Sequence, residues 1–334
     1  MTVLEAIQKG VDFLAKKGVE SPRLQTELLL AHLLKMPRMK LYLSFERALT
    51  PVETDALREL VKRRGRREPL QHITGSISFC GLEMAVNRHA LVPRPETELL
   101  AELGWQFLNG RAGSPQPAAA RSENVPYQDS HALDLGTGTG CLAIALAVKC
   151  PNAKITATDI SADALVWARE NAARNGVAQQ IEFLQGDGFA AIQNAGQASR
   201  LPGERVGASV ENENALVPTT SARAGETPAL RFDLIISNPP YIPSGEIATL
   251  QPEVRDFDPR TALDGGADGL DFYRRFSAQA KPYLKPDGKI MLEFGDGQAE
   301  AVRKIFENEK WIVEAVKEDY SQRARILIAK IKSG

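Results

Sequence analysis

After residue 130, short apolar runs alternate with segments of helical periodicity, and this alternation constrains the fold more than any other feature. Strands that alternate with helices form a mostly parallel sheet with helices packed on its faces. The last two runs are joined by too few residues for a crossover helix, so we expect those strands to be antiparallel. The predicted strands span residues 132–135, 154–158, 181–185, 232–237, 289–293, 312–316 and 324–331. The sequence therefore predicts an α/β fold with a seven-stranded, mostly parallel sheet.

The first 68 residues have a different pattern, in which apolar side chains recur at the helical period. Thr50 and Glu53 frame a capping box, with proline at the first helical position, and this predicts the start of a long helix. That helix runs into the basic segment 62–67, which we interpret as a solvated face or, alternatively, as a docking patch for an acidic or RNA-associated partner. We expect a small helical domain over residues 1–68.

Residues 69–92 follow as short β-like runs at 71–75, 77–79 and 82–86, which predict a β-hairpin linker. The remaining region, 93–334, contains the predicted sheet and forms the third unit.

Two stretches interrupt that region, near 110–130 and 196–229. They are rich in Ala, Gly, Pro and Ser and lack periodicity, so we interpret both as mobile surface loops without chemistry.

Composition narrows the class of protein. The chain has 334 residues, with 41 Lys plus Arg against 42 Asp plus Glu, so its formal net charge is -1. A near-neutral chain argues against a large nucleic-acid footprint, and we expect no direct nucleic-acid partner. Three cysteines without a CxxC pair exclude a disulfide scaffold and a cysteine-rich zinc site, and we expect no metal. The chain has neither a membrane-spanning apolar run nor the apolar core of a signal peptide, so we expect a cytoplasmic protein without a membrane partner.

A glycine-rich turn, Asp134-Leu-Gly-Thr-Gly-Thr-Gly140, joins the first predicted strand to a helix. Glycines let the backbone approach a ligand closely, and the turn places that ligand at a helix N-terminus. Asp159 ends the next strand, where a carboxylate can accept both hydroxyls of a ribose. The spacing of Gly138, Gly140 and Ala143 also fits the dinucleotide fingerprint, so at this point an NAD enzyme remains an alternative.

The segment Asn238-Pro239-Pro240-Tyr241 directly follows the strand 232–237, at the edge where such sheets bind ligands. Its prolines remove two backbone donors, so the Asn238 side-chain oxygen and the Pro239 carbonyl could accept both hydrogens of a planar NH2 group. Tyr241 would form an aromatic wall. This arrangement suits in-line methyl transfer from a sulfonium to an amide or amino nitrogen. It suits an adenine or cytosine amino group equally, so a DNA or RNA amino-methyltransferase remains the alternative.

Asp187 follows the third predicted strand and could accept from an adenine amino group, or alternatively cap a helix.

The order of these motifs resembles that of class I methyltransferases, which have a Rossmann-like fold and use S-adenosylmethionine. Four further segments are similar to the HemK/PrmC family, the release factor glutamine methyltransferases. They are Pro69–Gly75, Phe79–Gly81, Pro93–Glu98 and Ala262–Leu270. The resemblance spans nearly the whole chain, including the helical region, which it implies docks the protein substrate.

The resemblance implies N5-methylation of the glutamine in the Gly-Gly-Gln motif of class 1 peptide chain release factors, which modulates translation termination. The implied cofactor is S-adenosylmethionine, held by Gly136, Thr137, Gly138, Thr139, Gly140, Asp159, Asp187, Gly188 and Asn238. The implied substrate-binding residues are Asn238, Pro239, Pro240, Tyr241 and Phe79. Asn238, Pro239 and Tyr241 would form the catalytic centre. A catalytically silent, cofactor-binding scaffold is a second alternative.

Gly188 departs from the family pattern, in which a bulky residue is common after the adenine-site acid. We therefore expect adenine stacking to fall to Phe189 instead.

Overall fold

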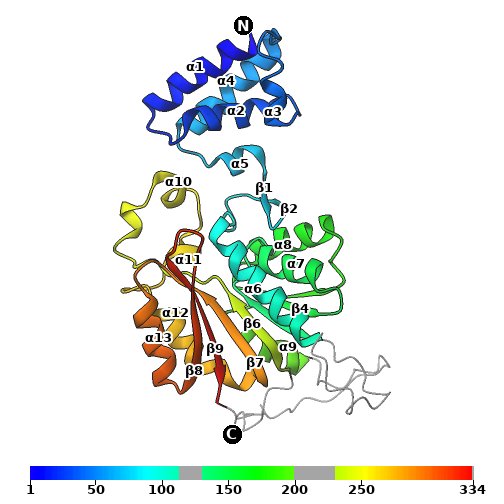
Figure 1. Ribbon diagram of the computed structural model, residues 1–334, viewed down its shortest axis with the longest axis vertical. Coiled ribbons are helices and arrows are strands. Elements are labelled where there is room, and N and C mark those ends of the chain that lie inside the picture. The colour runs from blue at the N-terminus through cyan, green and yellow to red at the C-terminus, as the bar shows by residue number, and fades with distance from the viewer. Residues whose placement is uncertain (113–129, 199–229, 333–334) are drawn as a thin grey trace, which may run out of the picture.

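The computed structural model describes residues 1–112, 130–198 and 230–332. The two stretches predicted as surface loops lie almost entirely outside the described residues. In Figure 1 the N-terminal helices form one end of an elongated molecule, and the sheet with its covering helices forms the other.

Four helices make up the N-terminal end: α1 (Val3–Lys16), α2 (Pro22–Leu33), α3 (Arg38–Leu41) and α4 (Pro51–Gly65). The predicted capping box is present, since Thr50 Oγ1 accepts from Glu53 N at 3.2 Å and a Glu53 oxygen accepts from Thr50 N at 2.9 Å. The apolar faces of these helices meet in a separate core that includes Leu14, Leu29 and Leu30. These residues therefore bury a hydrophobic cluster without help from the sheet.

The linker differs in part from its prediction. The hairpin forms from β1 (Ser76–Phe79) and β2 (Leu82–Ala85), which pair antiparallel. The β-like run predicted at 71–75 is wrong, because these residues form the short helix α5 (Leu70–Thr74). The Thr74 hydroxyl donates to the Leu70 carbonyl at 3.1 Å, and Gly75, with φ 80°, ends the helix in the left-handed conformation.

Seven strands form the large sheet, in the order β5-β4-β3-β6-β7-β9-β8. Their bounds are β3 (His131–Leu135), β4 (Lys154–Asp159), β5 (Ile181–Gln185), β6 (Phe232–Ser237), β7 (Leu284–Glu293), β8 (Trp311–Glu318) and β9 (Ala324–Ile331). Neighbours from β5 to β7 are parallel, whereas β9 is antiparallel to both β7 and β8. The predicted class I methyltransferase fold, with its antiparallel final pair, is confirmed.

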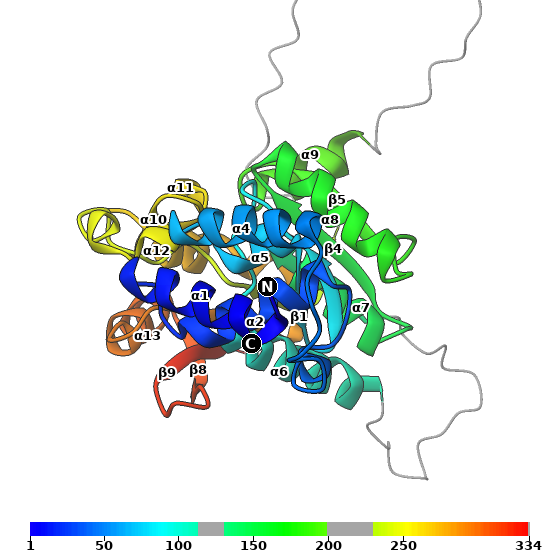
Figure 2. The same cartoon turned by 90° about the horizontal axis from the view of Figure 1, so that it is seen from above.

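Helices cover both faces of this sheet, as Figures 1 and 2 show. One face packs against α6 (Pro95–Ala112), α7 (Cys141–Lys149) and α8 (Ala162–Arg174). The other packs against α9 (Ala190–Ala198), α12 (Asp271–Gln279) and α13 (Ala299–Asn308). The remaining short helices are η2 (Ile247–Thr249), α10 (Pro252–Arg255), α11 (Arg260–Leu263) and η3 (Lys281–Tyr283). The two cores are built from alternate side chains of the same strands, as expected when both faces are covered.

The basic segment 62–67 joins the two ends of the molecule. Arg64, in the last turn of α4, and Arg67, two residues beyond the helix, both donate to Glu253 on α10, at 2.6 to 2.7 Å. Arg64 is only 5% exposed, so this is a partly buried ion-pair cluster. These two arginines are therefore neither a solvated face nor an open docking patch but a contact that fixes the helices over the sheet.

Candidate active site

The glycine turn between β3 and α7 is tied to the ends of the neighbouring strands. Gly136 N and Thr137 N both donate to the Thr158 carbonyl at 2.9 Å. Gly136 and Gly138 adopt φ of 71° and 54°, a left-handed conformation that favours glycine. A Cβ on Gly136 would meet no described heavy atom within 4 Å, and one on Gly138 only Ala90 Cβ, at 3.9 Å. The backbone of the turn therefore faces space in which a ligand can lie.

Asp134, in β3, is hydrogen-bonded to this turn and to the helix that follows it. Its Oδ2 accepts from Thr137 Oγ1 at 2.6 Å and from Ala143 N at 3.2 Å, while its Oδ1 has no hydrogen-bond partner among the described residues. Complete burial raises the pKa of Asp134 to about 7. Thr137 and Thr139 are buried as well, and Thr137 N and O and Thr139 O are already bonded within the protein, so the structure does not place either hydroxyl toward a ligand.

Asp159 ends β4 beside the turn. Its Oδ2 accepts from Gly138 N and its Oδ1 from Ser161 N, each at 2.8 Å. Burial raises the pKa of Asp159 above its ordinary value. Each carboxylate oxygen keeps a further lone pair, so this fixed carboxylate can still accept hydroxyl groups.

Asp187 and Gly188 follow β5, one strand further along the edge. The exposed Asp187 carboxylate accepts from Arg275 Nη1 at 2.6 Å. Gly188 has φ 58° and open space at its Cβ position. The expectation that Phe189 stacks on adenine is wrong. Phe189 is 4% exposed and its ring stacks on Tyr283 inside the core, with ring centroids 4.6 Å apart.

The segment 238–241 follows β6, whose neighbour in the sheet is β3. Ser237 Oγ donates to the Leu135 carbonyl at 2.6 Å, which holds the ends of these two strands together. Asn238 is half-buried, and its Nδ2 donates to Thr97 Oγ1 at 2.9 Å. Gln298 Nε2 donates to the Tyr241 carbonyl at 2.9 Å, and burial raises the pKa of the Tyr241 phenol to about 12. Tyr241 is therefore a neutral aromatic side chain at physiological pH.

Strand order brings most of the predicted site residues together. The chain runs from β3 outward through β4 and β5, then returns to β6 on the other side of β3. This reversal is a topological switch point, where open α/β sheets bind ligands. Asp187, Asp159, the glycine turn and Asn238 consequently follow the carboxyl ends of four consecutive strands, β5, β4, β3 and β6. Phe79 is not brought to this edge as an open wall, because it is 1% exposed within the core beside Met84 and Leu100.

Comparisons with known proteins identify the family of this chain. The model of the PrmC N-terminal domain matches residues 5–75, and that of the methyltransferase small domain matches residues 121–198. A release factor glutamine methyltransferase from Geobacter sulfurreducens is 39% identical over 305 residues, which cover 91% of this chain and 88% of that protein. One from Chlorobaculum tepidum is 36% identical over 300 residues, which cover 90% and 87%. The chain belongs to the release factor glutamine methyltransferase family.

Among solved structures, a methyltransferase from Pyrococcus furiosus is similar to this family member with a TM-score of 0.44 and 19% identity. That match covers 80% of this chain and 98% of the solved one. Within the described residues, no helix combines the length and the apolar character needed to cross a membrane.

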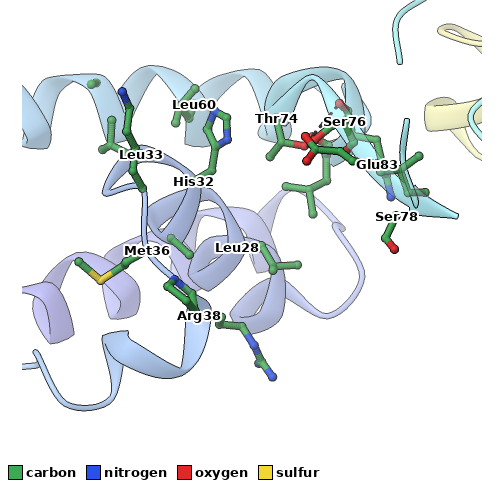
Figure 3. Close-up of a pocket in the computed structure, with 17 residues that line it drawn as sticks. Leu28, His32, Leu33, Met36, Arg38, Leu60, Thr74, Ser76, Ser78 and Glu83 are labelled. Atoms are coloured by element: carbon green, nitrogen blue, oxygen red, sulfur yellow. Dashed lines mark hydrogen bonds between the residues drawn. The ribbon is translucent and has the colours of Figure 1, made fainter. Parts of the chain in front are cut away.

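A wide cleft of about 1150 Å³ lies elsewhere in this methyltransferase, between the N-terminal helices and the hairpin (Figure 3). Apolar side chains such as Leu28, Leu33 and Leu60 line it together with His32 and Glu83. None of the predicted site residues lines this cleft, so it is separate from the candidate active site.

Thr97 and Glu293 are not among the site residues predicted from the sequence, but hydrogen bonds join them to Asn238 in the structure. Thr97 lies in the first turn of α6, and Glu293 is the last residue of β7. The Thr97 hydroxyl donates to Glu293 Oε2 at 2.8 Å, and both residues are 2% exposed. The sequence feature that could have indicated Glu293 is an acidic residue at the carboxyl end of the apolar strand β7, which lies next to β6.

Proposed function

We propose that this enzyme transfers a methyl group from S-adenosylmethionine to the side-chain amide nitrogen, N5, of the glutamine in the Gly-Gly-Gln motif of class 1 peptide chain release factors, modulating translation termination. The observation that carries the proposal is the position of Asn238 and Pro239, two hydrogen-bond acceptors, beside the glycine turn at the switch point of the sheet. Since release factors act on cytoplasmic ribosomes, we place the enzyme in the cytoplasm.

The carboxyl edge of the sheet fits the methyl donor. The open space over Gly136 and Gly138 suits the methionine end, and the fixed Asp159 carboxylate suits the ribose hydroxyls. Asp187 and Gly188 would accept the adenine, with Asp187 sharing or releasing its contact to Arg275. When bound, S-adenosylmethionine supplies an electrophilic methyl group.

The substrate amide would lie against the segment 238–241. Asn238 Oδ1 and the Pro239 carbonyl would each accept one hydrogen of the glutamine NH2 group. These two bonds hold the nitrogen in place and shift electron density onto it, so that its poor lone pair is aimed in line at the methyl group. The proton leaves after transfer, so no strong base is required. The neutral Tyr241 ring would pack against the flat amide.

Docking of the release factor is proposed for the helical domain over residues 1–68. Figure 1 shows that these helices stand above the carboxyl edge of the sheet, next to α5 and the hairpin. A protein substrate that reaches the edge would therefore pass them.

The test is Asn238→Ala with a purified class 1 release factor and labelled S-adenosylmethionine. We expect kcat/KM to fall at least about tenfold, which corresponds to about 1.4 kcal/mol of barrier. Asn152→Ala, an exposed asparagine at the opposite end of β4, is the matched control and should keep wild-type activity. Mass spectrometry should map the added methyl group of the wild-type reaction to the Gly-Gly-Gln glutamine.

Two results would contradict the proposal. A loss below about threefold in Asn238→Ala, less than 1 kcal/mol, would remove Asn238 from its central role. Label that appears in nucleic acid instead of protein would favour the DNA or RNA amino-methyltransferase.

A further inference from the structure

Three residues that are distant in the sequence form one hydrogen-bonded chain. Asn238 Nδ2 donates to Thr97 Oγ1 at 2.9 Å, and Thr97 Oγ1 donates to Glu293 Oε2 at 2.8 Å. They come from the end of β6, the first turn of α6 and the end of β7. Thr97 and Glu293 are each 2% exposed, so neither is placed to touch a substrate held at the open edge.

The donor and acceptor directions along this series of hydrogen bonds matter. An asparagine amide can exchange the positions of its oxygen and nitrogen by rotating about its last side-chain bond. One orientation presents an acceptor to a ligand and the other presents two donors. A site that accepts the hydrogens of an amide NH2 group needs the oxygen outward. With the nitrogen outward, N–H groups would face N–H groups and the substrate would be repelled.

A threonine hydroxyl carries one hydrogen, and here that hydrogen is directed at the Glu293 carboxylate. Thr97 Oγ1 can then only accept from Asn238, so the nitrogen of Asn238 is bound to Thr97 and its oxygen remains for the ligand. Above its pKa, the Glu293 carboxylate is ionised and has no hydrogen to donate, so in that form it fixes the direction of both bonds.

The contacts around Thr97 and Glu293 agree with this role. A threonine near a helix start commonly bonds to its own backbone. The Thr97 hydroxyl instead bonds to Asn238, just after β6, and to Glu293, at the end of β7. A carboxylate that is 2% exposed is costly to bury unless it is hydrogen-bonded, and the Thr97 hydroxyl supplies such a bond. Burial raises the pKa of Glu293 to about 7, opposed by the Thr97 hydrogen bond and the nearby charge of Arg325.

We propose that Thr97 and Glu293 are positioning residues that fix the Asn238 amide with its oxygen toward the substrate nitrogen. This inference rests on the proposed function and extends it. It names the residues that make the neutral Asn238 side chain act solely as a hydrogen-bond acceptor toward the substrate. Neither residue is proposed to touch the substrate or the methyl donor.

The experiment compares Thr97→Val, Thr97→Ser, Glu293→Leu and the double variant Thr97→Val/Glu293→Leu. Thr97→Val keeps the shape of the side chain and removes its hydroxyl. We expect it to lower kcat for release factor methylation at least about tenfold while the Kd for S-adenosylmethionine changes less than about threefold. Thr97→Ser restores most of the lost rate. Thr249→Val, on the exposed 3-10 helix η2, is the matched control and should retain wild-type kcat.

The double variant separates positioning from general damage to the fold. If Glu293 acts through Thr97, the double variant is no slower than Thr97→Val alone, whereas independent structural losses multiply. Thermal unfolding of each variant establishes that the compared proteins are folded. A wild-type kcat in Thr97→Val, no rescue by serine, or multiplicative losses would each overturn the proposal.

A measurement without substrate distinguishes this inference from the proposed function. The side-chain NH2 signals of Asn238, assigned by their loss in Asn238→Ala, should be protected from hydrogen exchange in the wild type and unprotected in Thr97→Val. If the wild type methylates no release factor but this protection holds, the proposed function fails and the orientation stands. Equal exchange in both proteins overturns the orientation whatever the activity.

Discussion

Replacement of Glu253 by glutamine is expected to weaken the contact between the N-terminal helices and the sheet. Glu253 accepts from Arg64 Nη2 at 2.7 Å, from Arg67 Nε at 2.6 Å and from Arg67 Nη2 at 2.6 Å. A glutamine keeps one acceptor oxygen, but its NH2 group points donors at a guanidinium. The variant therefore removes the carboxylate that both partly buried arginines share, although Arg67 keeps the more distant charge of Glu20.

The expected magnitude follows from the burial and the remaining partners of Arg64. Removing one side of a buried ion pair costs about 3–5 kcal/mol. Arg64 is 5% exposed but still donates to Gln25 Oε1 at 2.9 Å and to the Glu68 carbonyl at 3.1 Å. Arg67 is more accessible to water, at 21% exposed. We therefore expect the lower part of the range or less, about 2 kcal/mol.

The assay is thermal unfolding, with hydrogen exchange to locate the change. A loss of about 2 kcal/mol lowers the midpoint by about 4–8 °C in a cooperative unit of the size of the sheet domain. Faster exchange should be confined to α4 and α10. Release factor methylation should fall while the Kd for S-adenosylmethionine is unchanged, because the glycine turn is not touched.

The matched control is Glu59→Gln on the same helix. Glu59 pairs with Lys62 at 2.7 Å, but both side chains are largely exposed, and exposed pairs contribute little. Its midpoint should equal that of the wild type. If Glu253→Gln behaves like Glu59→Gln, the two arginines do not hold the helices over the sheet and the reasoning is refuted.

Two further changes probe the glycine turn. Gly140→Ala should destabilise the protein by about 1–2 kcal/mol and weaken binding of S-adenosylmethionine. Gly140 has φ 83°, and a Cβ there would meet Ala168 Cβ and Ile144 Cδ1 at 3.1 Å. An unchanged melting midpoint and an unchanged Kd would contradict this prediction. Asp134 binds a proton more readily in the folded state, so its contribution lowers the free energy of unfolding by up to about 1.4 kcal/mol per pH unit as pH rises from 3.8 to about 7. Asp134→Asn should remove that slope in denaturant titrations, and an unaltered slope would refute the assignment.

The sheet was predictable from the sequence because its strands are apolar on both faces and are separated by clear helical segments. Three of the predicted ranges, 181–185, 232–237 and 324–331, coincide with β5, β6 and β9. The error at 71–75 has a local cause. β-branched side chains in a short run favour a strand, but the bond from Thr74 to the Leu70 carbonyl stabilises a single helical turn instead.

The site could be predicted only as far as motifs follow strand ends. Asp159 and the glycine turn lie beside one another because β3 and β4 are neighbours, a relation implied by their succession in the chain. The burial of individual side chains could not be predicted from the motifs in the same way. Phe79 and Phe189 adjoin the motifs in sequence, yet both rings point into the core, since an aromatic side chain gains more from burial than from an open edge.

The choice of asparagine at position 238 follows from the carboxylate two hydrogen bonds away. An aspartate would accept hydrogens in either rotation and would need no positioning. It would also place a second negative charge two hydrogen bonds from Glu293, where each charge raises the pKa of the other carboxyl and favours protonation of one of them. One of them would take up a proton and become a donor, which removes the advantage. A neutral amide avoids that conflict, but only if its rotation is fixed. The Thr97 hydroxyl fixes the rotation of the Asn238 amide. This explains why a buried polar residue lies between Glu96 and Glu98 in the first turn of α6.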